Sequence, residues 1–254
     1  MKVVTYNVNG IRAALKKDWI GWLTDVNPDV VCLQEIKASP EQVAEIQVLE
    51  DMGYKHYWYP AQKKGYSGTA ILTKVTPKHI EYGCGYEDYD FEGRVIRVDF
   101  EDVSVMSIYF PSGTTGGIRQ DFKYRFLADF YEYVHKLLVD IPNLLVCGDF
   151  NICHRAIDIH NPKSNANTSG FLPAEREWME NFINTGFIDT FRSLHPDPHH
   201  YTWWSYRAGS RAKNLGWRID YIMASKGLES RIKGASILAD AVHSDHCPML
   251  LELA

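Results

Sequence analysis

The sequence lacks the features that mark membrane-spanning, secreted and disulfide-stapled proteins. No apolar run reaches the roughly 18 residues that a membrane-spanning helix needs, so none is predicted. Residues 2–6 begin a strand where a secreted protein would carry an apolar leader, and we therefore expect no signal peptide. The cysteines have no pairing or metal-binding spacing, which favours a reducing cytoplasm. They are Cys32, Cys84, Cys147, Cys153 and Cys247.

The sequence also has no excess of basic residues. Lysine and arginine number 27 against 32 acidic residues, for a formal net charge of −5. A uniformly basic nucleic-acid-binding protein is thereby excluded, and any polyanionic partner must be met by local basic patches. Internal repeats, low-complexity segments and linkers are absent as well. The composition is that of a globular chain, 45% hydrophobic, and we expect a single domain over residues 1–254.

The most informative stretch is Leu144–Asn151. Its apolar residues predict a buried strand that ends at Gly148, and Asp149 and Asn151 follow two positions apart. That spacing places both polar side chains on one face of an extended backbone, where they are able to orient a water molecule and hold a phosphate or a metal ion. The competing interpretation is an Asx turn, since Asp and Asn favour turns through local hydrogen bonds.

The rest of the chain alternates strands with helices. Helices are expected over residues 12–25, from Pro40 to Gly53 after a capping box at Ser39, along the stripe from Phe122 to Leu138, and over 173–184. Strands are expected at residues 2–6, 29–35, 69–73, 94–100, 103–109, 144–147, 217–223 and 249–253, with a hairpin at Glu101-Asp102. This order predicts a layered α/β protein with mixed sheets and outer helices.

Polar residues recur where the predicted strands end. If the strands are aligned, these side chains meet at one edge, as sites in α/β folds do. Carboxylates with amides and one histidine suit an oxygen-preferring ion such as magnesium, whereas zinc prefers thiolates and several imidazoles. The residues concerned are Asn7, Glu35, Tyr109, Asp149, Asn151, Asp220, Asp245 and His246.

Several motifs in order carry a resemblance. Together they resemble the exonuclease III type of apurinic/apyrimidinic endonuclease, within the endonuclease/exonuclease/phosphatase superfamily. The likeness runs from residue 2 to residue 252, and no single motif is specific without the others. The motifs are Asn7-Val8-Asn9-Gly10-Ile11-Arg12, Leu33-Gln34-Glu35, Gly65-Tyr66-Ser67-Gly68, Glu92-Gly93-Arg94, Gly148-Asp149-Phe150-Asn151, Gly216-Trp217-Arg218-Ile219-Asp220-Tyr221 and Ser244-Asp245-His246-Cys247-Pro248.

The resemblance implies a four-layered α/β sandwich, with two packed mixed β-sheets flanked by helices. It implies a monomeric enzyme that cuts double-stranded DNA 5′ to abasic sites and also trims 3′ ends. It further implies a Mg²⁺ or Mn²⁺ cofactor, with Glu35 as principal ligand assisted by Asn7 and Asp245. The wider metal-binding set also includes Asp149, Asn151 and His246. Whether one ion or two take part differs among proposed family mechanisms.

Catalytic roles follow from the same likeness. Asp149 would position and deprotonate the attacking water, and Asn151 would orient water and phosphate. His246 would bind a phosphate oxygen, with Asp220 fixing its tautomer. Tyr109 would touch the phosphate or ease departure of the leaving group.

Other residues are expected to bind the substrate. Family members line a pocket for the extruded sugar at the positions of Trp203, Trp217 and Ile219. A core position is the alternative for Trp203 and Trp217. For the neighbouring Trp204 we prefer the core position. Each basic residue alone is compatible with a solvated surface charge, but the set supplies a phosphate-neutralising face. Its members are Arg12, Lys63, Lys64, Tyr66, Arg94, Arg119, Lys123, Arg207, Arg211 and Lys213.

The sequence departs from the family pattern at several positions. Asn9 stands where some members have a carboxylate, Ser112 and Thr168 stand where others have asparagines, and Trp203 replaces a phenylalanine. These differences bear on the balance between endonuclease and exonuclease activity. Two alternatives remain: a catalytically inactive nucleic-acid-binding regulator on the same fold, and a phosphodiesterase of small molecules or lipid head groups. Retention of the polar set argues against the first, and the aromatic pocket beside a basic loop argues against the second.

Overall fold

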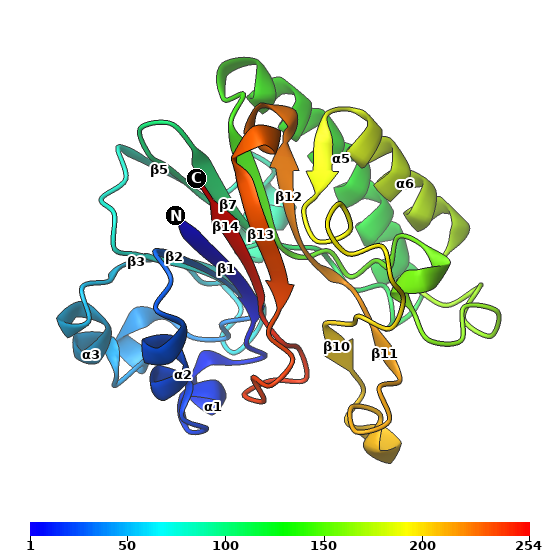
Figure 1. Cartoon of the computed structure of the whole chain (residues 1–254), viewed down its shortest axis with the longest axis horizontal. Helices are drawn as coiled ribbons and strands as arrows, with labels where there is room; N and C mark the ends of the chain where they lie inside the picture. The colour runs from blue at the N-terminus through cyan, green and yellow to red at the C-terminus, as the bar shows by residue number, and fades with distance from the viewer.

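The computed structural model describes all residues, 1–254, and shows two six-stranded mixed sheets packed together with helices on their outer faces (Figure 1). The strands of the first sheet are Lys2–Asn7 (β1), Val30–Gln34 (β2), Lys55–Tyr59 (β3), Thr69–Thr73 (β4), Ile232–Ile237 (β13) and Met249–Leu253 (β14). Their order is β13-β14-β1-β2-β4-β3. The two termini lie close together because Met1 donates its amino group to the Leu253 carbonyl at 2.7 Å.

The second sheet repeats this plan. Its strands are His79–Tyr82 (β5), Val95–Asp99 (β6), Ser104–Tyr109 (β7), Leu144–Asp149 (β8), Phe187–Asp189 (β9) and Asp220–Ser225 (β12). Their order is β5-β6-β7-β8-β12-β9, and β7 and β8 are parallel whereas β12 runs antiparallel to β8. A separate two-stranded ribbon joins Trp203–Trp204 (β10) to Gly216–Trp217 (β11). The expected four-layered α/β sandwich is confirmed.

Side chains alternate between the two faces of each strand and so build separate cores. Along β8, Leu145 and Cys147 face the core between the sheets, whereas Leu144 and Val146 face the outer helices. Along β1, Val3 joins the same central core and Val4 faces outward. Both faces of each sheet are therefore covered, which explains why these strands are nearly continuous apolar runs.

Helices cover the outer faces. The helices are Ile11–Leu15 (α1), Trp19–Val26 (α2), Ile46–Asp51 (α3), Glu87–Phe91 (α4), Gly117–Asp140 (α5) and Pro173–Asn184 (α6), with short 3₁₀ turns at Pro40–Gln42, Ala156–Asp158, Arg207–Gly209 and Lys226–Arg231. Helices α1, α2 and α3 pack on the first sheet, and α5 and α6 on the second. No helix combines the length and apolar character needed to cross a bilayer.

Two predicted helices are wrong in detail. The helix expected over residues 12–25 is interrupted, because α1 ends at Leu15 and Asp18, the residue before α2, has a left-handed φ of 60°. The helix expected after Ser39 is a 3₁₀ turn followed by the short α3, although Gln42 does accept the Ser39 N–H at 3.0 Å as the capping box predicts. Strands β3, β5, β9 and β13, helix α4 and the β10–β11 ribbon were not predicted, because edge strands and short helices give weak periodicity.

The topology brings several strand ends to one place. Strands β7 and β8 are parallel and in register, so Tyr109 lies opposite Asp149. Asp220 begins β12 and pairs with Asp149 from the other side. In the first sheet Asn7 ends β1 beside Gln34, and Glu35 follows directly. The edge where both sheets end is therefore lined with the polar residues singled out in the sequence.

Candidate active site

Asp149 lies at the centre of the polar cluster and is only 1% exposed. Gly148 makes this placement possible: a Cβ there would lie 1.8 Å from the Ile108 carbonyl oxygen on the neighbouring strand. Oδ1 of Asp149 accepts the Asn151 N–H at 2.8 Å, and Oδ2 accepts the Asn7 and Asn151 amides at 2.9 and 3.2 Å. The Asx turn is therefore present, and it is the same arrangement that directs both side chains into the site.

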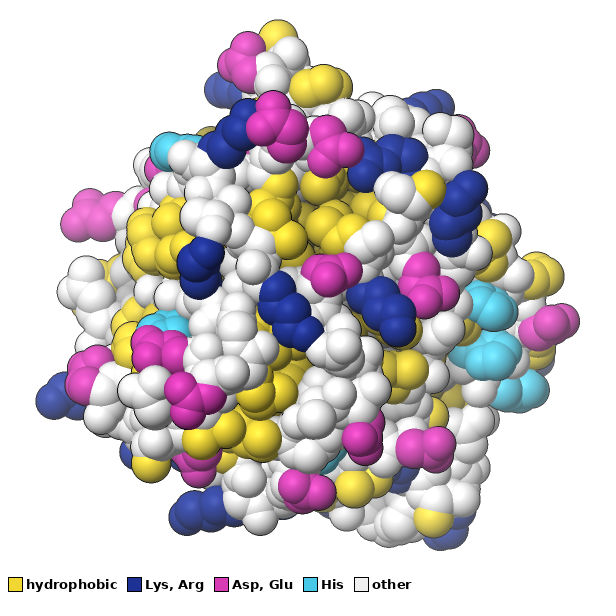
Figure 2. Space-filling model, turned by 60° about the vertical axis from the view of Figure 1, so that its left-hand side comes forward, with side chains coloured by type: hydrophobic (Ala, Val, Ile, Leu, Met, Phe, Trp, Pro, Cys, Tyr) yellow, Lys and Arg dark blue, Asp and Glu magenta, His cyan; other side chains and the backbone are white.

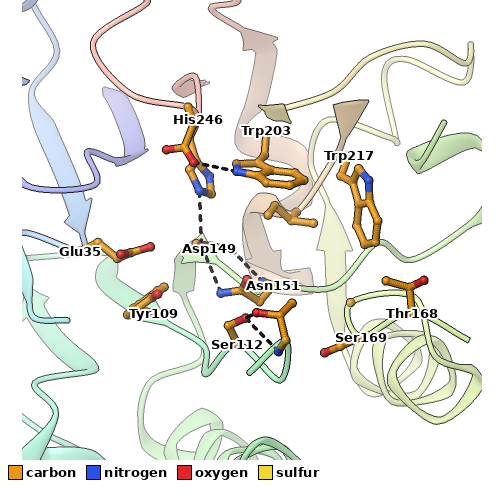
Figure 3. Close-up of a pocket in the computed structure, with 14 residues that line it drawn as sticks. Glu35, Tyr109, Ser112, Asp149, Asn151, Thr168, Ser169, Trp203, Trp217 and His246 are labelled. Carbon is orange, nitrogen blue, oxygen red and sulfur yellow. Dashed lines mark hydrogen bonds and ion pairs between the residues drawn. The ribbon is translucent and has the colours of Figure 1, made fainter. Parts of the chain in front are cut away.

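His246 approaches Asp149 from the opposite side (Figure 3). Its Nδ1 is 2.9 Å from Oδ2 of Asp220, so Asp220 accepts the Nδ1 proton and turns Nε2 toward Asp149, 3.9 Å away. Burial alone would lower the pKa of His246, but the carboxylates of Asp220, Asp149 and Asp245 together outweigh burial and raise that pKa to about 10. His246 is therefore a positively charged donor at neutral pH, held in one orientation by Asp220.

The pKa of Asp149 is also shifted. Burial and the neighbouring Asp220 carboxylate together raise it to about 7. Positive charge on His246 acts in the opposite direction. A carboxylate that exchanges its proton near neutral pH is suited to act as a general base, and a cation nearby would favour its ionised form.

Glu35 faces this group from the first sheet. Its backbone is left-handed with a φ of 49°, which turns the side chain inward after β2 ends. Asn7 is fully buried and donates to Oε1 of Glu35 and to Asp149, both at 2.9 Å, while its own oxygen accepts the Asn9 N–H. Asn7 thus links Glu35, which follows a strand of the first sheet, to Asp149, which ends a strand of the second. The Lys37 ammonium, 3.0 Å from Oε2, keeps the pKa of Glu35 low despite burial.

Three of the predicted metal ligands come together. Glu35, Asp149 and His246 each offer one ligand atom, and these atoms all lie within 4.8 Å of one another. Two carboxylates and a neighbouring amide fit a hard, oxygen-preferring divalent cation. Asp245 lies beside this three-residue cluster and lines the same cavity. Its carboxylate accepts the Asn9 amide at 2.9 Å and the Trp203 indole N–H at 3.0 Å. Asn7 and Asn151 also border the cluster through their bonds to Asp149.

A cavity of about 410 Å³ opens beside these groups (Figure 3). Trp203 and Trp217 lie opposite each other on the β10–β11 ribbon, with ring centroids 6.0 Å apart and planes at 89°. Ile219 completes the apolar wall, and Ser112 and Thr168 face it. Trp203 and Trp217 therefore line a cavity, and their contact with an extruded sugar stays a prediction. Trp204 is 5% exposed and packs in a core as expected.

A buried ion network that the sequence did not reveal supports the cavity from behind. Arg218, between Trp217 and Ile219, is fully buried and donates to Asp158 at 2.7 Å and to Asp189 at 2.6 Å. Asp158 also accepts the Arg192 guanidinium at 2.9 Å. The only sequence sign was an arginine inside an apolar strand. The network fixes the backbone that presents both pocket residues.

This network makes stability depend on acid. Burial acts to raise the pKa of Asp158, but Arg218 and Arg192 together lower it below its usual value. The stabilisation from these ion pairs is therefore complete above the unfolded-state pKa and is lost as the pH falls through the folded-state pKa. Unfolding free energy should therefore fall below about pH 4. Asp158→Asn, measured by urea unfolding at pH 7, should cost about 3 kcal/mol and flatten this dependence. An exposed control, Asp25→Asn, should do neither; an unchanged acid profile in Asp158→Asn would contradict the assignment.

The basic residues divide into exposed and buried groups. Arg12, Arg207 and Lys213 are exposed, and Tyr66 is half-buried with its hydroxyl accepting from Arg119 at 3.1 Å. Arg94 is 1% exposed and donates to Glu92 and to the Tyr109 carbonyl, both at 2.7 Å. The prediction that Arg94 and Lys123 contact phosphate directly is wrong, because Lys123 is also fully buried. Arg211 is bound to the carbonyls of Ser244, Ala239 and Ala241.

A basic groove adjoins the acidic cluster. It measures about 770 Å³ and includes Arg12, Lys16, Lys17 and Lys37, of which sequence reasoning identified only Arg12. Lys37 connects the groove to Glu35. Figure 2 shows acidic and basic side chains interspersed with apolar ones on the face turned forward. The local concentration of positive charge lies in the groove itself, through Arg12 and the three lysines.

Comparison with known proteins agrees with this geometry. The model of the Endonuclease/Exonuclease/phosphatase family matches residues 4–246. An exodeoxyribonuclease of Bacillus subtilis is 44% identical, covering 99% of this chain and 98% of its own. The DNA repair nuclease APEX1 of Danio rerio is 40% identical over 100% of this chain and 82% of its own. The solved structure of an AP endonuclease from Archaeoglobus fulgidus superposes with a TM-score of 0.91 at 30% identity, covering 100% and 99% of the two chains. The chain therefore belongs to the endonuclease/exonuclease/phosphatase family.

Proposed function

We propose that this chain is a metal-dependent DNA phosphodiester hydrolase that incises double-stranded DNA 5′ to abasic sites and also removes nucleotides and blocking groups from 3′ ends. One observation carries the proposal: Glu35 and the Asp149–His246 pair meet beside an aromatic-walled cavity and a basic groove. The names of the relatives support the same substrate class, since they include an exodeoxyribonuclease and a DNA repair nuclease.

Mg²⁺ or Mn²⁺ is the proposed cofactor, held by Glu35 with Asp149 and assisted by Asp245 and the amides of Asn7 and Asn151. When bound, the ion neutralises charge on the phosphate and on the departing oxygen. Asn7 keeps the two carboxylates together by donating to each at 2.9 Å. His246, as an imidazolium with Nε2 free to donate, is better suited to a phosphate oxygen than to the metal.

The chain's own residues supply the remaining chemistry. Asp149 accepts the proton of the attacking water, and the amide of Asn151, fixed by the Phe110 carbonyl at 3.0 Å, orients that water. His246 donates to a phosphate oxygen while Asp220 holds its tautomer. Burial and the carboxylates of Glu35 and Asp149 raise the pKa of Tyr109 well above its usual value, so its hydroxyl stays a proton donor at the leaving group.

The aromatic cavity accounts for preference toward baseless sugars. Extruding a nucleotide costs a few kcal/mol, and the cost is smallest when its base is missing. Trp203, Trp217 and Ile219 present apolar surface to the sugar, while the polar cluster faces its phosphate. A sugar that still carries its base would have to place that base, as well as the sugar, in the same cavity. The geometry therefore favours abasic lesions over intact duplex.

A panel of defined duplexes tests the proposal. Purified protein is incubated with duplexes that are abasic, intact or blocked by a 3′-phosphate, each with Mg²⁺ and with chelator. We expect metal-dependent incision 5′ to the abasic residue and slower trimming of the other 3′ ends. An inert protein that still binds all three duplexes would instead indicate the regulator, and hydrolysis confined to small phosphodiesters would indicate the second alternative.

Trp217→Ala should reduce kcat/KM for the abasic duplex by about 10–100-fold, because one wall of the apolar cavity is removed. Trimming of 3′ ends should fall less, since that substrate needs no base-excluding pocket. Steady-state rates on both substrates measure the ratio. Trp217→Phe, which keeps an aromatic wall, is the control and should retain most of the preference. An equal loss on both substrates would remove Trp217 from substrate choice.

Salt should weaken DNA binding steeply, because Arg12 and the neighbouring lysines of the basic groove neutralise phosphates. Arg12→Gln should lower affinity for every duplex and reduce the slope of log K against log salt by about 1. Fluorescence anisotropy at several salt concentrations gives the slope. Lys233→Gln is the control, because Lys233 is exposed near the start of β13, at the end of the sheet away from Asn7. A salt-independent affinity would contradict a duplex substrate.

The proposal includes the setting in which the protein works. All five cysteines are free and four are buried, which supports a reducing cytoplasm. We propose that residues 1–254 act as one domain and that the protein is a monomer, because the residues of the cluster all come from one chain. Sedimentation velocity with and without duplex would test the monomer.

A further inference from the structure

A fully buried ion pair lies next to the active site without taking part in the mechanism above. Lys123 on α5 and Glu175 on α6 are both 0% exposed, and Nζ lies 2.6 Å from Oε1. Replacing such a pair by apolar residues is often neutral or stabilising, so stability alone does not explain its presence. The remaining hydrogen bonds of both side chains show where the pair acts.

Lys123 holds the backbone of the catalytic turn. Its ammonium donates to the Asn151 carbonyl oxygen at 2.8 Å. Asn151 has a left-handed φ of 51°, a conformation that asparagine adopts at single positions when local hydrogen bonds support it. The same residue sends its side chain to Asp149 and to the Phe110 carbonyl. Lys123 therefore helps to keep the peptide that directs the Asn151 amide toward the catalytic carboxylate.

Glu175 holds the opposite wall of the cavity. Its Oε2 accepts the N–H groups of Gly170 at 2.6 Å and Leu172 at 3.0 Å. Its Oε1 accepts the Gln120 amide at 3.1 Å, and Gln120 in turn accepts the Ser169 hydroxyl at 2.7 Å. Ser169 and Gly170 both line the cavity. The pair is thus bonded to the catalytic turn on one side and to the substrate pocket on the other.

Gly170 brings the two sides into contact. A Cβ at this position would lie 3.0 Å from the Trp217 ring and 3.2 Å from the Asn151 carbonyl oxygen. The oxygen that Lys123 binds therefore packs against the same glycine whose N–H Glu175 binds. A shift of the pocket wall is transmitted to Asn151 through this contact.

We propose that Lys123 and Glu175 are positioning residues that couple the sugar pocket to the Asp149–Asn151 turn, so that a sugar seated against Trp217 and the water-orienting amide are held in one geometry. The proposal rests on the function proposed above. The Lys123 side chain is 0% exposed, and its ammonium donates to Asn151 and to Glu175. It therefore does not act as an amine nucleophile toward the sugar aldehyde. Misplacement by about 1 Å from a remote change is enough to cost about 100-fold in rate.

The test uses the double variant Lys123→Met/Glu175→Gln. Removing both charges leaves no unpaired buried ion, and the glutamine oxygen still accepts from Gly170 and Leu172, so folding is preserved while the bond to Asn151 is lost. Thermal unfolding, single-turnover incision at saturating enzyme and the ratio of abasic incision to 3′ trimming are measured. We expect a melting temperature near wild type, an incision rate lower by about tenfold or more, and a reduced ratio.

Two controls separate positioning from general packing. Arg97→Met/Asp99→Asn removes another ion pair of low exposure, 8% and 17%, on β6, and should leave the single-turnover rate and the ratio unchanged. Gln120→Met, at a half-buried position, removes the bonds that Gln120 makes to Glu175 and to Ser169 but leaves the bond from Lys123 to Asn151 in place. It should therefore lower the ratio more than the rate, and it decides the pocket side even if the double variant fails to fold.

Wild-type rate and ratio in a folded double variant, or an unchanged ratio in Gln120→Met, would overturn the coupling. An inactive wild-type protein would instead refute the proposed nuclease function, so the two failures are distinguishable.

Discussion

Asp149→Asn is expected to lower metal-dependent incision of an abasic duplex by about 10³–10⁴-fold, because the change removes the general base. The side-chain amides of Asn7 and Asn151 both donate to the Asp149 carboxylate and hold it in one orientation. The substituted amide keeps nearly the same shape and accepts the Asn151 N–H, so the turn should persist. Single-turnover incision in Mg²⁺ measures the loss.

Two further measurements make the Asp149 result interpretable. Thermal unfolding and duplex binding should stay close to wild type, which shows that the chemical step alone is affected. The exposed Asp25→Asn variant should keep full activity. Incision within about tenfold of wild type would remove Asp149 from the central role.

Glu35→Gln should produce the second-largest loss through the metal ion. The Glu35 carboxylate lies 3.0 Å from the Lys37 ammonium and accepts a hydrogen bond from Asn7. The side-chain amide of glutamine has nearly the same shape as this carboxylate but carries no charge. We expect metal affinity to fall by about 100-fold or more, with activity partly recovered at high Mn²⁺ concentration. Calorimetric titration of the protein with Mn²⁺ measures the affinity without relying on catalysis.

Exposed Glu229→Gln is the matched control for this change and should bind Mn²⁺ as wild type does. Wild-type Mn²⁺ affinity in Glu35→Gln would place the cation elsewhere. Loss of activity without loss of affinity would assign Glu35 to substrate binding.

Residues at strand ends were predictable, and residues whose partners lie far away in sequence were not. The two-residue spacing of Asp149 and Asn151 depends only on local backbone geometry, and it holds in the structure. Strand order was not needed to expect Glu35 nearby, since parallel strands in such folds end at one edge. The roles of Arg218 and Lys123 depend on partners far away in the sequence, which are Asp158 and Asp189 for Arg218 and Glu175 for Lys123. Periodicity does not supply such pairings.

The charge of a single residue did not indicate whether its side chain is exposed or buried. Arg12 and Arg94 look alike in sequence, yet one lies in an exposed groove and the other is buried against Tyr109. The same holds for helix boundaries: the apolar stripe over residues 12–25 is real, but Asp18 adopts a left-handed conformation that splits it. Tertiary contacts decide both cases, and they override local preference.

Diffraction from crystals of the protein with an abasic duplex and Mn²⁺, recorded at the manganese absorption edge, is the most direct test of the account. The central claim is that groups from both sheets form one metal-dependent centre at the phosphate of the lesion. We predict anomalous density in contact with the Glu35 carboxylate and with the phosphate 5′ to the baseless sugar, which lies between Trp203 and Trp217. Manganese bound away from Glu35, or a duplex lying on another face, would contradict it.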